Sequence, residues 1–131
     1  MAMFKVLPLL AFSLLAGGCS DMCGNTIVSQ VTSPDGRRNA VMFQRDCGAT
    51  TGFSTQVSIL NAGKPLSGIG NVFRADDDHG AARAGEWGGP WTEIKWLAPD
   101  HLQVLYAAKS RLFTQEKDVS GVKITYQAIG D

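Results

Sequence analysis

The sequence lacks the features that usually point to an enzyme or to a nucleic-acid-binding protein. Its 12 lysines and arginines balance its 12 aspartates and glutamates, so no basic field exists to recruit nucleic acid. It contains no G-x-S-x-G, H-E-x-x-H, Walker A or dinucleotide-binding glycine motif. Its two histidines, His79 and His101, fall in a predicted loop and a predicted turn. We therefore expect neither catalysis nor a cofactor.

A long hydrophobic run is missing as well. Residues 6–15 are apolar or small, but about ten residues rise only ~15 Å as a helix, half of a ~30 Å hydrocarbon core. Together with the short preceding segment that carries Lys5, this run is typical of a signal peptide and not of a permanent membrane span. We expect residues 1–18 to direct export and then to be removed.

Small residues lead from this run to a cysteine, in the segment Leu15-Ala16-Gly17-Gly18-Cys19. The segment resembles the bacterial lipobox, in which the cysteine receives diacylglycerol before cleavage. The resemblance implies lipid on Cys19, a tether at residues 19–22, and a single domain at residues 23–131 held close to the bilayer. Ser20 stands where retention at the inner membrane requires aspartate, which implies an outer-membrane protein facing the periplasm. The alternative is an ordinary signal peptide, with Cys19 as a plain thiol.

Cysteine is scarce, since Cys19, Cys23 and Cys47 are the only three. An odd number in an exported chain leaves one thiol to explain. Lipid on Cys19 would leave Cys23 and Cys47 as a pair in an oxidising compartment, which predicts one disulfide. Closing this loop of about 25 residues would contribute roughly 3.5 kcal/mol in the chain-entropy model. The alternative is two unconnected buried thiols.

Apolar residues recur with a period of two and not of 3.6. Residues 53–59 and 122–128 alternate between apolar or β-branched and polar side chains, and residues 27–32 do so less clearly. Residues 40–43 are apolar at every position, which predicts a strand covered on both faces. No apolar stripe of helical spacing extends beyond about two turns.

Turn residues separate these runs. Ser33-Pro34-Asp35-Gly36 predicts a turn between a strand ending near Thr32 and one beginning near Arg38. Pro99-Asp100 predicts a hairpin that brings Trp96 against one of the even-numbered residues of 102–106. The regular spacing of strands and turns predicts an all-β fold, a small antiparallel sandwich or open barrel of about six to seven strands.

Residues 76–90 form a stretch without a strand pattern, and loops of this length are usually functional or disordered. Asp76, Asp77, Asp78 and His79 are consecutive potential metal ligands, but neighbouring side chains of an extended chain point in opposite directions. The sequence therefore favours a solvated acidic turn over a metal site. We expect these four residues and Trp87 to form a binding surface for an envelope protein or a glycan.

Three tryptophans lie in or near this stretch. Trp87 is flanked by glycines and far from any strand pattern, so we expect it to be exposed. Trp91 and Trp96 are expected to fill the core instead. An exposed aromatic ledge here would suit a sugar, a peptide or a membrane interface.

The segment Cys47-Gly48-Ala49-Thr50-Thr51-Gly52-Phe53-Ser54-Thr55-Gln56-Val57-Ser58-Ile59, together with Ser33-Pro34-Asp35-Gly36, Trp96-Leu97 and Leu102-x-Val104-x-Tyr106, is similar to a family of small uncharacterised bacterial lipoproteins and exported proteins. The likeness covers most of the mature domain. It implies a β-rich domain of unknown function outside the cytoplasm, and it carries over no activity, ligand or catalytic residue.

The leading hypothesis is a membrane-anchored binding or interaction module of the cell envelope. One alternative is a hydrolytic or metal-dependent envelope enzyme that uses residues 76–79. Another is a protective protein, either an inhibitor of an attacking hydrolase or a factor that excludes phage.

Overall fold

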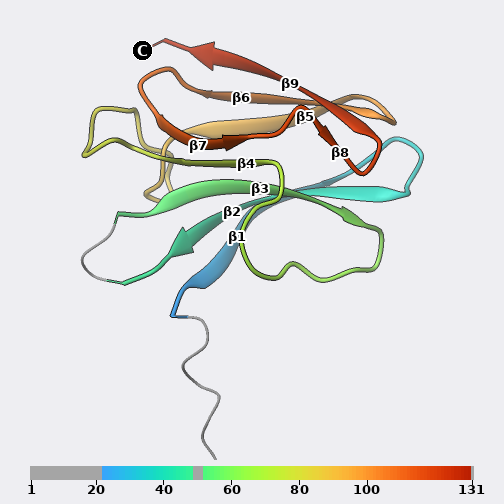
Figure 1. Cartoon of the computed structure of the whole chain (residues 1–131), viewed down its shortest axis with the longest axis horizontal. Helices are drawn as coiled ribbons and strands as arrows, with labels where there is room; N and C mark the ends of the chain where they lie inside the picture. Colours follow the sequence, from blue (N-terminus) through green and yellow to red (C-terminus); the bar gives the residue numbers. More distant parts are fainter. Residues whose placement is uncertain (1–21, 49–51, 131) are drawn as a thin grey trace, which may run out of the picture.

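The computed structural model describes residues 22–48 and 52–130, and this part of the chain forms nine β-strands and no helix (Figure 1). The first sheet has the order β1 (Gly24–Thr32), β2 (Arg38–Asp46), β3 (Ser54–Asn61), β4 (Phe73–Asp76) and β7 (Arg111–Gln115). The second has the order β5 (Thr92–Ala98), β6 (His101–Ala107), β9 (Val122–Ile129) and β8 (Asp118–Val119). The predicted all-β class is confirmed, with more strands than the six or seven expected because the short ones carry little pattern.

The core lies between the two sheets, which form a sandwich. In Figure 1, β5, β6 and β9 lie in the upper part of the view and β1, β2 and β3 in the lower part, with β4 and β7 between them. Alternate residues of each strand face inward, as the period of two predicts. The buried side chains that meet there are Ala40, Met42, Val57, Ile59, Val72, Phe73 and Ala75 of the first layer, and Ile94, Leu102, Val104, Val122 and Ile124 of the second.

The predicted turn between β1 and β2 is confirmed at its expected ends. The Ser33 hydroxyl donates to Asp35 Oδ1 over 2.7 Å, and the backbone N–H of Arg37 donates to the same carboxylate over 3.1 Å. Gly36 has a φ of 75°, the left-handed conformation that glycine adopts without a steric penalty. The turn is therefore held by its own polar residues, as the sequence indicated.

The predicted hairpin across Pro99-Asp100 is also confirmed, because β5 pairs with β6 and Trp96 lies opposite Leu102. Its indole N–H donates to the Val31 carbonyl over 2.8 Å and thereby links the two sheets. Trp96 packs against the core while keeping a partly exposed edge.

One strand pair does not follow the antiparallel expectation. After β6 the chain crosses to the first sheet as β7, which runs antiparallel to β4. It then enters the second sheet again as β8, and β9 follows, antiparallel to β8 and parallel to β6. The parallel pair is a consequence of this excursion, since the two strands are not joined by a hairpin.

The first sheet is covered on part of its outer face, the face turned away from the second sheet. Gln56 and Ser58 are buried there together with the inward-facing residues of β3, so both faces of this strand are buried instead of the one that alternation predicts. Residues 62–71 provide the cover at Gly70, whose N–H donates to Gln56 Oε1 over 2.7 Å. A Cβ at Gly70 would lie 2.8 Å from the Val57 carbonyl oxygen, so the loop approaches the sheet more closely than other residues allow.

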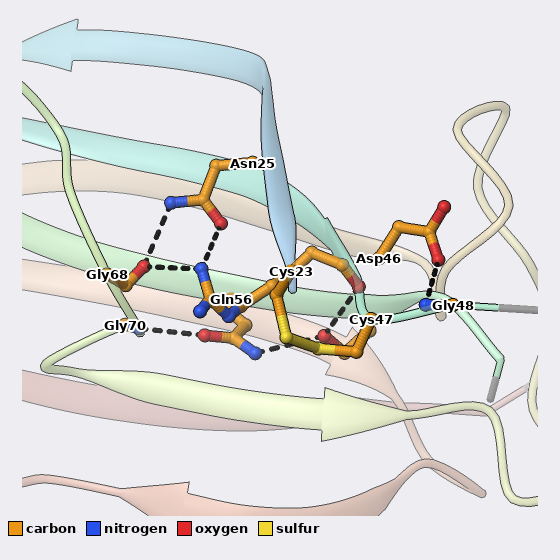
Figure 2. The surroundings of a disulfide bond; sticks show 10 residues. Cys23, Asn25, Asp46, Cys47, Gly48, Gln56, Gly68 and Gly70 are labelled. Atoms are coloured by element: carbon orange, nitrogen blue, oxygen red, sulfur yellow. Dashed lines mark hydrogen bonds between the residues drawn. A yellow bond between two sulfur atoms is a disulfide. The ribbon is translucent and has the colours of Figure 1, made fainter. Parts of the chain in front are cut away.

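The predicted disulfide joins Cys23 and Cys47 (Figure 2). It connects the residue before β1 to the residue after β2, where the two strands end side by side. The predicted lipidation site, Cys19, lies outside the described residues. Within those residues, no helix has the length and hydropathy that a membrane span requires.

Candidate functional site

A row of polar side chains crosses the open part of the first sheet's outer face. Strand register places Arg45 of β2 opposite Ser54 of β3, Ser54 opposite Asp76 of β4, and Asp76 opposite Arg111 of β7. Directly opposite residues share one face of a sheet, so four strands contribute neighbouring side chains. The sequence separates these residues by up to 66 positions, and only the sheet brings them together.

This row forms the floor of a pocket of about 470 Å³. A second row contributes Gln56 and Arg74, which are opposite each other in β3 and β4. The remaining walls come from the ends of the β2–β3 connection, from the turn after β4, and from β7. The complete lining is Arg45, Cys47, Gly52, Ser54, Gln56, Arg74, Asp76, Asp77, His79, Arg111 and Phe113.

Arg45 is a buried part of this pocket, with 7% of its surface exposed. One guanidinium nitrogen, Nη1, donates to Asn25 Oδ1 over 2.7 Å and to the Gly68 carbonyl over 3.1 Å. Asn25 also donates to the same Gly68 carbonyl, over 2.9 Å (Figure 2). These contacts hold Arg45 between β1 and the covering loop, beside the disulfide.

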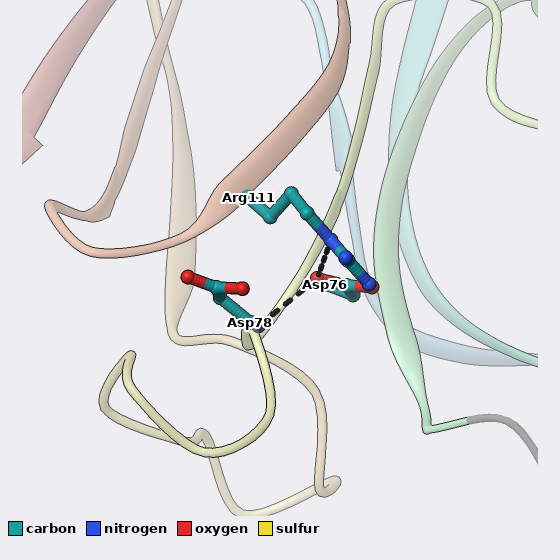
Figure 3. Close-up of polar contacts among 3 residues, drawn as sticks. All are labelled: Asp76, Asp78 and Arg111. Carbon is teal, nitrogen blue, oxygen red and sulfur yellow. Dashed lines mark hydrogen bonds and ion pairs between the residues drawn. The ribbon is translucent and has the colours of Figure 1, made fainter.

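Asp76 and Arg111 form a two-point ion pair. Arg111 Nη2 lies 2.6 Å from Asp76 Oδ2, and Arg111 Nε donates to Oδ1 over 3.0 Å (Figure 3). These hydrogen bonds lower the pKa of the Asp76 carboxyl, and the carboxylate in turn raises the pKa of Arg111. The backbone N–H of Asp78 donates to Oδ1 over 2.9 Å, so both carboxylate oxygens are occupied within the fold.

The turn after β4 separates the residues of the predicted acidic surface, so that only some of them line the pocket. Asp78 and His79 have φ values of 53° and 57°, and Gly80 follows at 90°, so the chain reverses tightly here. Asp77 and His79 line the pocket, whereas Asp78 does not. No three His, Cys, Asp or Glu side chains within residues 22–48 and 52–130 are arranged to hold a metal ion. The structure therefore places Asp76, Asp77 and His79 in the same pocket as Arg45, Arg74 and Arg111.

Trp87 does not have the exposed position that the sequence predicts. It is half-buried and packs against the core, and its indole N–H donates to the Thr55 hydroxyl over 2.8 Å. The ring lies across Gly85, where a Cβ would be 2.3 Å from it. Gln44 donates to the Trp87 carbonyl. The glycines thus let the loop fold back on the sandwich, and Trp87 is absent from the pocket lining.

Trp91 also departs from the expected core position. It is half-buried, and the Arg83 guanidinium lies 4.3 Å from its ring centroid, a cation–π contact. Residues 76–90 therefore form an ordered connection with contacts of their own, including a bridge between Ala84 and Pro90.

Among the pocket residues that the sequence did not predict are its three arginines, Arg45, Arg74 and Arg111, and Phe113. For one of the strands that carry them, β4, a short signal was present. Phe73-Arg74-Ala75-Asp76 alternates apolar and charged residues, which is the pattern of a strand with a charged outer face. In β7 a bulge opposite Arg74 and Ala75 disturbs the alternation of apolar and polar residues. The register in which β7 pairs with β4 cannot be predicted from the local sequence.

Comparison of the chain with protein-family models, with curated proteins and with solved structures finds no match. Its function is therefore inferred from the chemistry of the pocket and from the amino-terminal sequence.

Proposed function

We propose that the protein is a membrane-anchored binding module of the bacterial envelope, and that the pocket on the outer face of β2, β3, β4 and β7 is its ligand site. The observation that carries this proposal is a preformed hollow of about 470 Å³ lined by convergent polar groups. Small-ligand sites in proteins typically measure roughly 300–1,000 Å³ and contain a few placed polar groups.

The envelope assignment is supported from two sides. The lipobox-like segment at residues 15–19 and the likeness to a family of small lipoproteins favour export and lipid on Cys19. The Cys23–Cys47 disulfide suits an oxidising compartment such as the periplasm. With Ser20 after the anchor, we place the domain at the outer membrane, on its periplasmic side.

Binding is favoured over catalysis because two reactive groups of the pocket, Ser54 and Asp76, are held by contacts within the fold. The Ser54 hydroxyl donates to the Arg45 carbonyl over 3.2 Å and accepts from the Gln56 amide over 3.0 Å, so no base activates it. Asp76 has a lowered pKa and two-point contact with Arg111, which suits a fixed carboxylate better than an acid that donates a proton.

Photo-crosslinking in intact cells tests the binding role. Phe113 lines the pocket and has 58% of its surface exposed, so a photoreactive phenylalanine analogue at this position would reach a bound ligand. Leu97 in the second sheet has 47% of its surface exposed and provides the matched control. We expect a defined adduct from position 113 and none from position 97. Adducts that do not differ between the two positions, or none at position 113, would contradict the proposal.

The anchor is tested separately by mass spectrometry of the mature amino terminus and by fractionation. We expect diacylglycerol on Cys19 and a membrane-bound chain. Cys19→Ala should move the protein out of the membrane fraction, while the neighbouring Ser20→Ala should leave it there. An unmodified Cys19 thiol in the membrane-bound wild type would refute lipid anchoring.

A further inference from the structure

Arg74 stands out in the pocket because its guanidinium has no partner among the described residues. Its guanidinium makes no hydrogen bond and no ion pair with the rest of the described chain, and its Nε is buried without an acceptor. A buried donor left unsatisfied is destabilising, and more so when it is charged. The two terminal nitrogens of Arg74 are not among the buried unsatisfied atoms, so they are the donors that an acceptor in the pocket can reach.

Two side chains next to Arg74 on this face, those of Gln56 and Asp76, are already engaged. Gln56, directly opposite in β3, gives its carbonyl oxygen to the Gly70 N–H and its amide to Ser54. Asp76, two residues further along β4 on the same face, binds Arg111 through both oxygens. In the structure neither side chain accepts a hydrogen bond from Arg74.

The charged side chains that line the pocket are more often positive than negative, which favours binding of an anion. Three guanidinium groups, those of Arg45, Arg74 and Arg111, face two carboxylates, those of Asp76 and Asp77. Arginine binds carboxylates and phosphates through two parallel N–H donors, so a single oxyanion could bind both terminal nitrogens of the Arg74 guanidinium.

An apolar surface borders this charge. The Phe113 ring is largely exposed at the rim, and the Arg111 guanidinium lies 5.3 Å from the ring centroid. An exposed aromatic ring next to a cationic floor can hold the flat or apolar part of a ligand whose anionic group points inward.

From these contacts we infer that the pocket binds a small ligand, or a chain end, through a carboxylate or phosphate group on Arg74, with an apolar or ring face against Phe113. This inference deepens the proposed binding function and rests on it. The oxyanion is the shared chemistry, and it can come from a sugar acid, from an aromatic or amino-acid carboxylate, or from a phosphate.

The test uses the full chain, purified in a nonionic detergent, and observes the side-chain Nε–Hε signals of its arginines by NMR. The probes are benzoate, glucuronate and inorganic phosphate, with benzamide and glucose as neutral analogues of the first two. We expect the Arg74 signal to shift with at least one anion and not with the neutral analogues. The anion that binds most tightly identifies the source. Equal responses to benzoate and benzamide, or no response to any anion, would overturn the inference.

Arg74→Gln provides the matching variant, and Arg37→Gln, at an exposed turn position, is its control. Loss of a charge-assisted contact should weaken anion binding roughly 10- to 100-fold in Arg74→Gln and leave it unchanged in Arg37→Gln. Phe113→Ala should weaken benzoate more than phosphate. If Arg74→Gln bound the anions as tightly as the wild type, the assignment of Arg74 as the anion-binding residue would be wrong.

Stability without ligand distinguishes a binding residue from a structural one. Removal of an unpaired, partly buried charge should leave the urea midpoint of Arg74→Gln unchanged or raise it. A lowered midpoint would show that Arg74 supports the fold and would overturn the inference. Photo-crosslinks from position 113 with no anion binding would leave the proposed binding function intact and remove only the oxyanion.

Discussion

Reduction of the Cys23–Cys47 disulfide should destabilise the domain by a measurable and calculable amount. The bond spans a sequence separation of 24 residues. In the chain-entropy model, releasing a loop of this length adds about 3.5 kcal/mol of conformational freedom to the unfolded state. With a urea m-value of about 1–3 kcal/mol/M, the unfolding midpoint should fall by roughly 1.2 to 3.5 M.

The assay is urea unfolding followed by tryptophan fluorescence, with and without a thiol reductant. The double variant Cys23→Ser/Cys47→Ser should unfold at the midpoint of the reduced wild type and show no response to reductant. A wild-type midpoint that stays the same on reduction would refute the loop-entropy reasoning. Such a result would mean that pairing between β1 and β2, which involves eight residue pairs in the fold, persists in the unfolded ensemble. This pairing would then already hold Cys23 and Cys47 together.

Two further changes test the fold. Asp76→Asn should lower the urea midpoint slightly at pH 7, because it removes a partly exposed pair with Arg111. The pKa of Asp76 is lowered by folding, so this stabilisation is present above the unfolded value of about 3.9 and is lost as pH falls through the folded one. The two midpoints should therefore converge in strong acid. Leu102→Ala should cost about 2–5 kcal/mol by chemical denaturation, because the side chain is fully buried. The exposed Leu97→Ala should change stability by less than about 0.5 kcal/mol.

The parts of the fold that local chemistry determines could be predicted from the sequence. The turn at residues 33–36, the hairpin across Pro99-Asp100 and the disulfide all depend on residues with strong local preferences or on simple counting. The doubly buried run at residues 40–43 was readable for the same reason, since every position is apolar. These features need no knowledge of which distant strands pair.

The candidate site could be predicted only in part because it depends on register between distant strands. The sequence directed attention to Asp76, Asp77 and His79, which line the pocket, but also to Trp87, which packs inward. Trp87 was misjudged because flanking glycines were read as a sign of exposure. In the structure, Gly85 and Gly89 provide the space in which the indole lies against the sheet.

The pocket lies where the loop of residues 62–71 leaves part of the first sheet's outer face uncovered. Residues 62–71 close the outer face of the first sheet at Gly68 and Gly70, and the polar row from Arg45 to Arg111 remains open beyond them. A fold selected for stability alone would place short polar or apolar residues in the neighbouring row of Gln56 and Arg74, at the centre of the pocket floor. Arg74, with an unsatisfied buried Nε, departs from this rule without a compensating contact inside the described chain. Natural proteins concentrate such departures at functional sites, where the missing partner is supplied by a ligand. The unpartnered guanidinium, more than the acidic run beside it, is therefore the residue on which the function of this pocket depends.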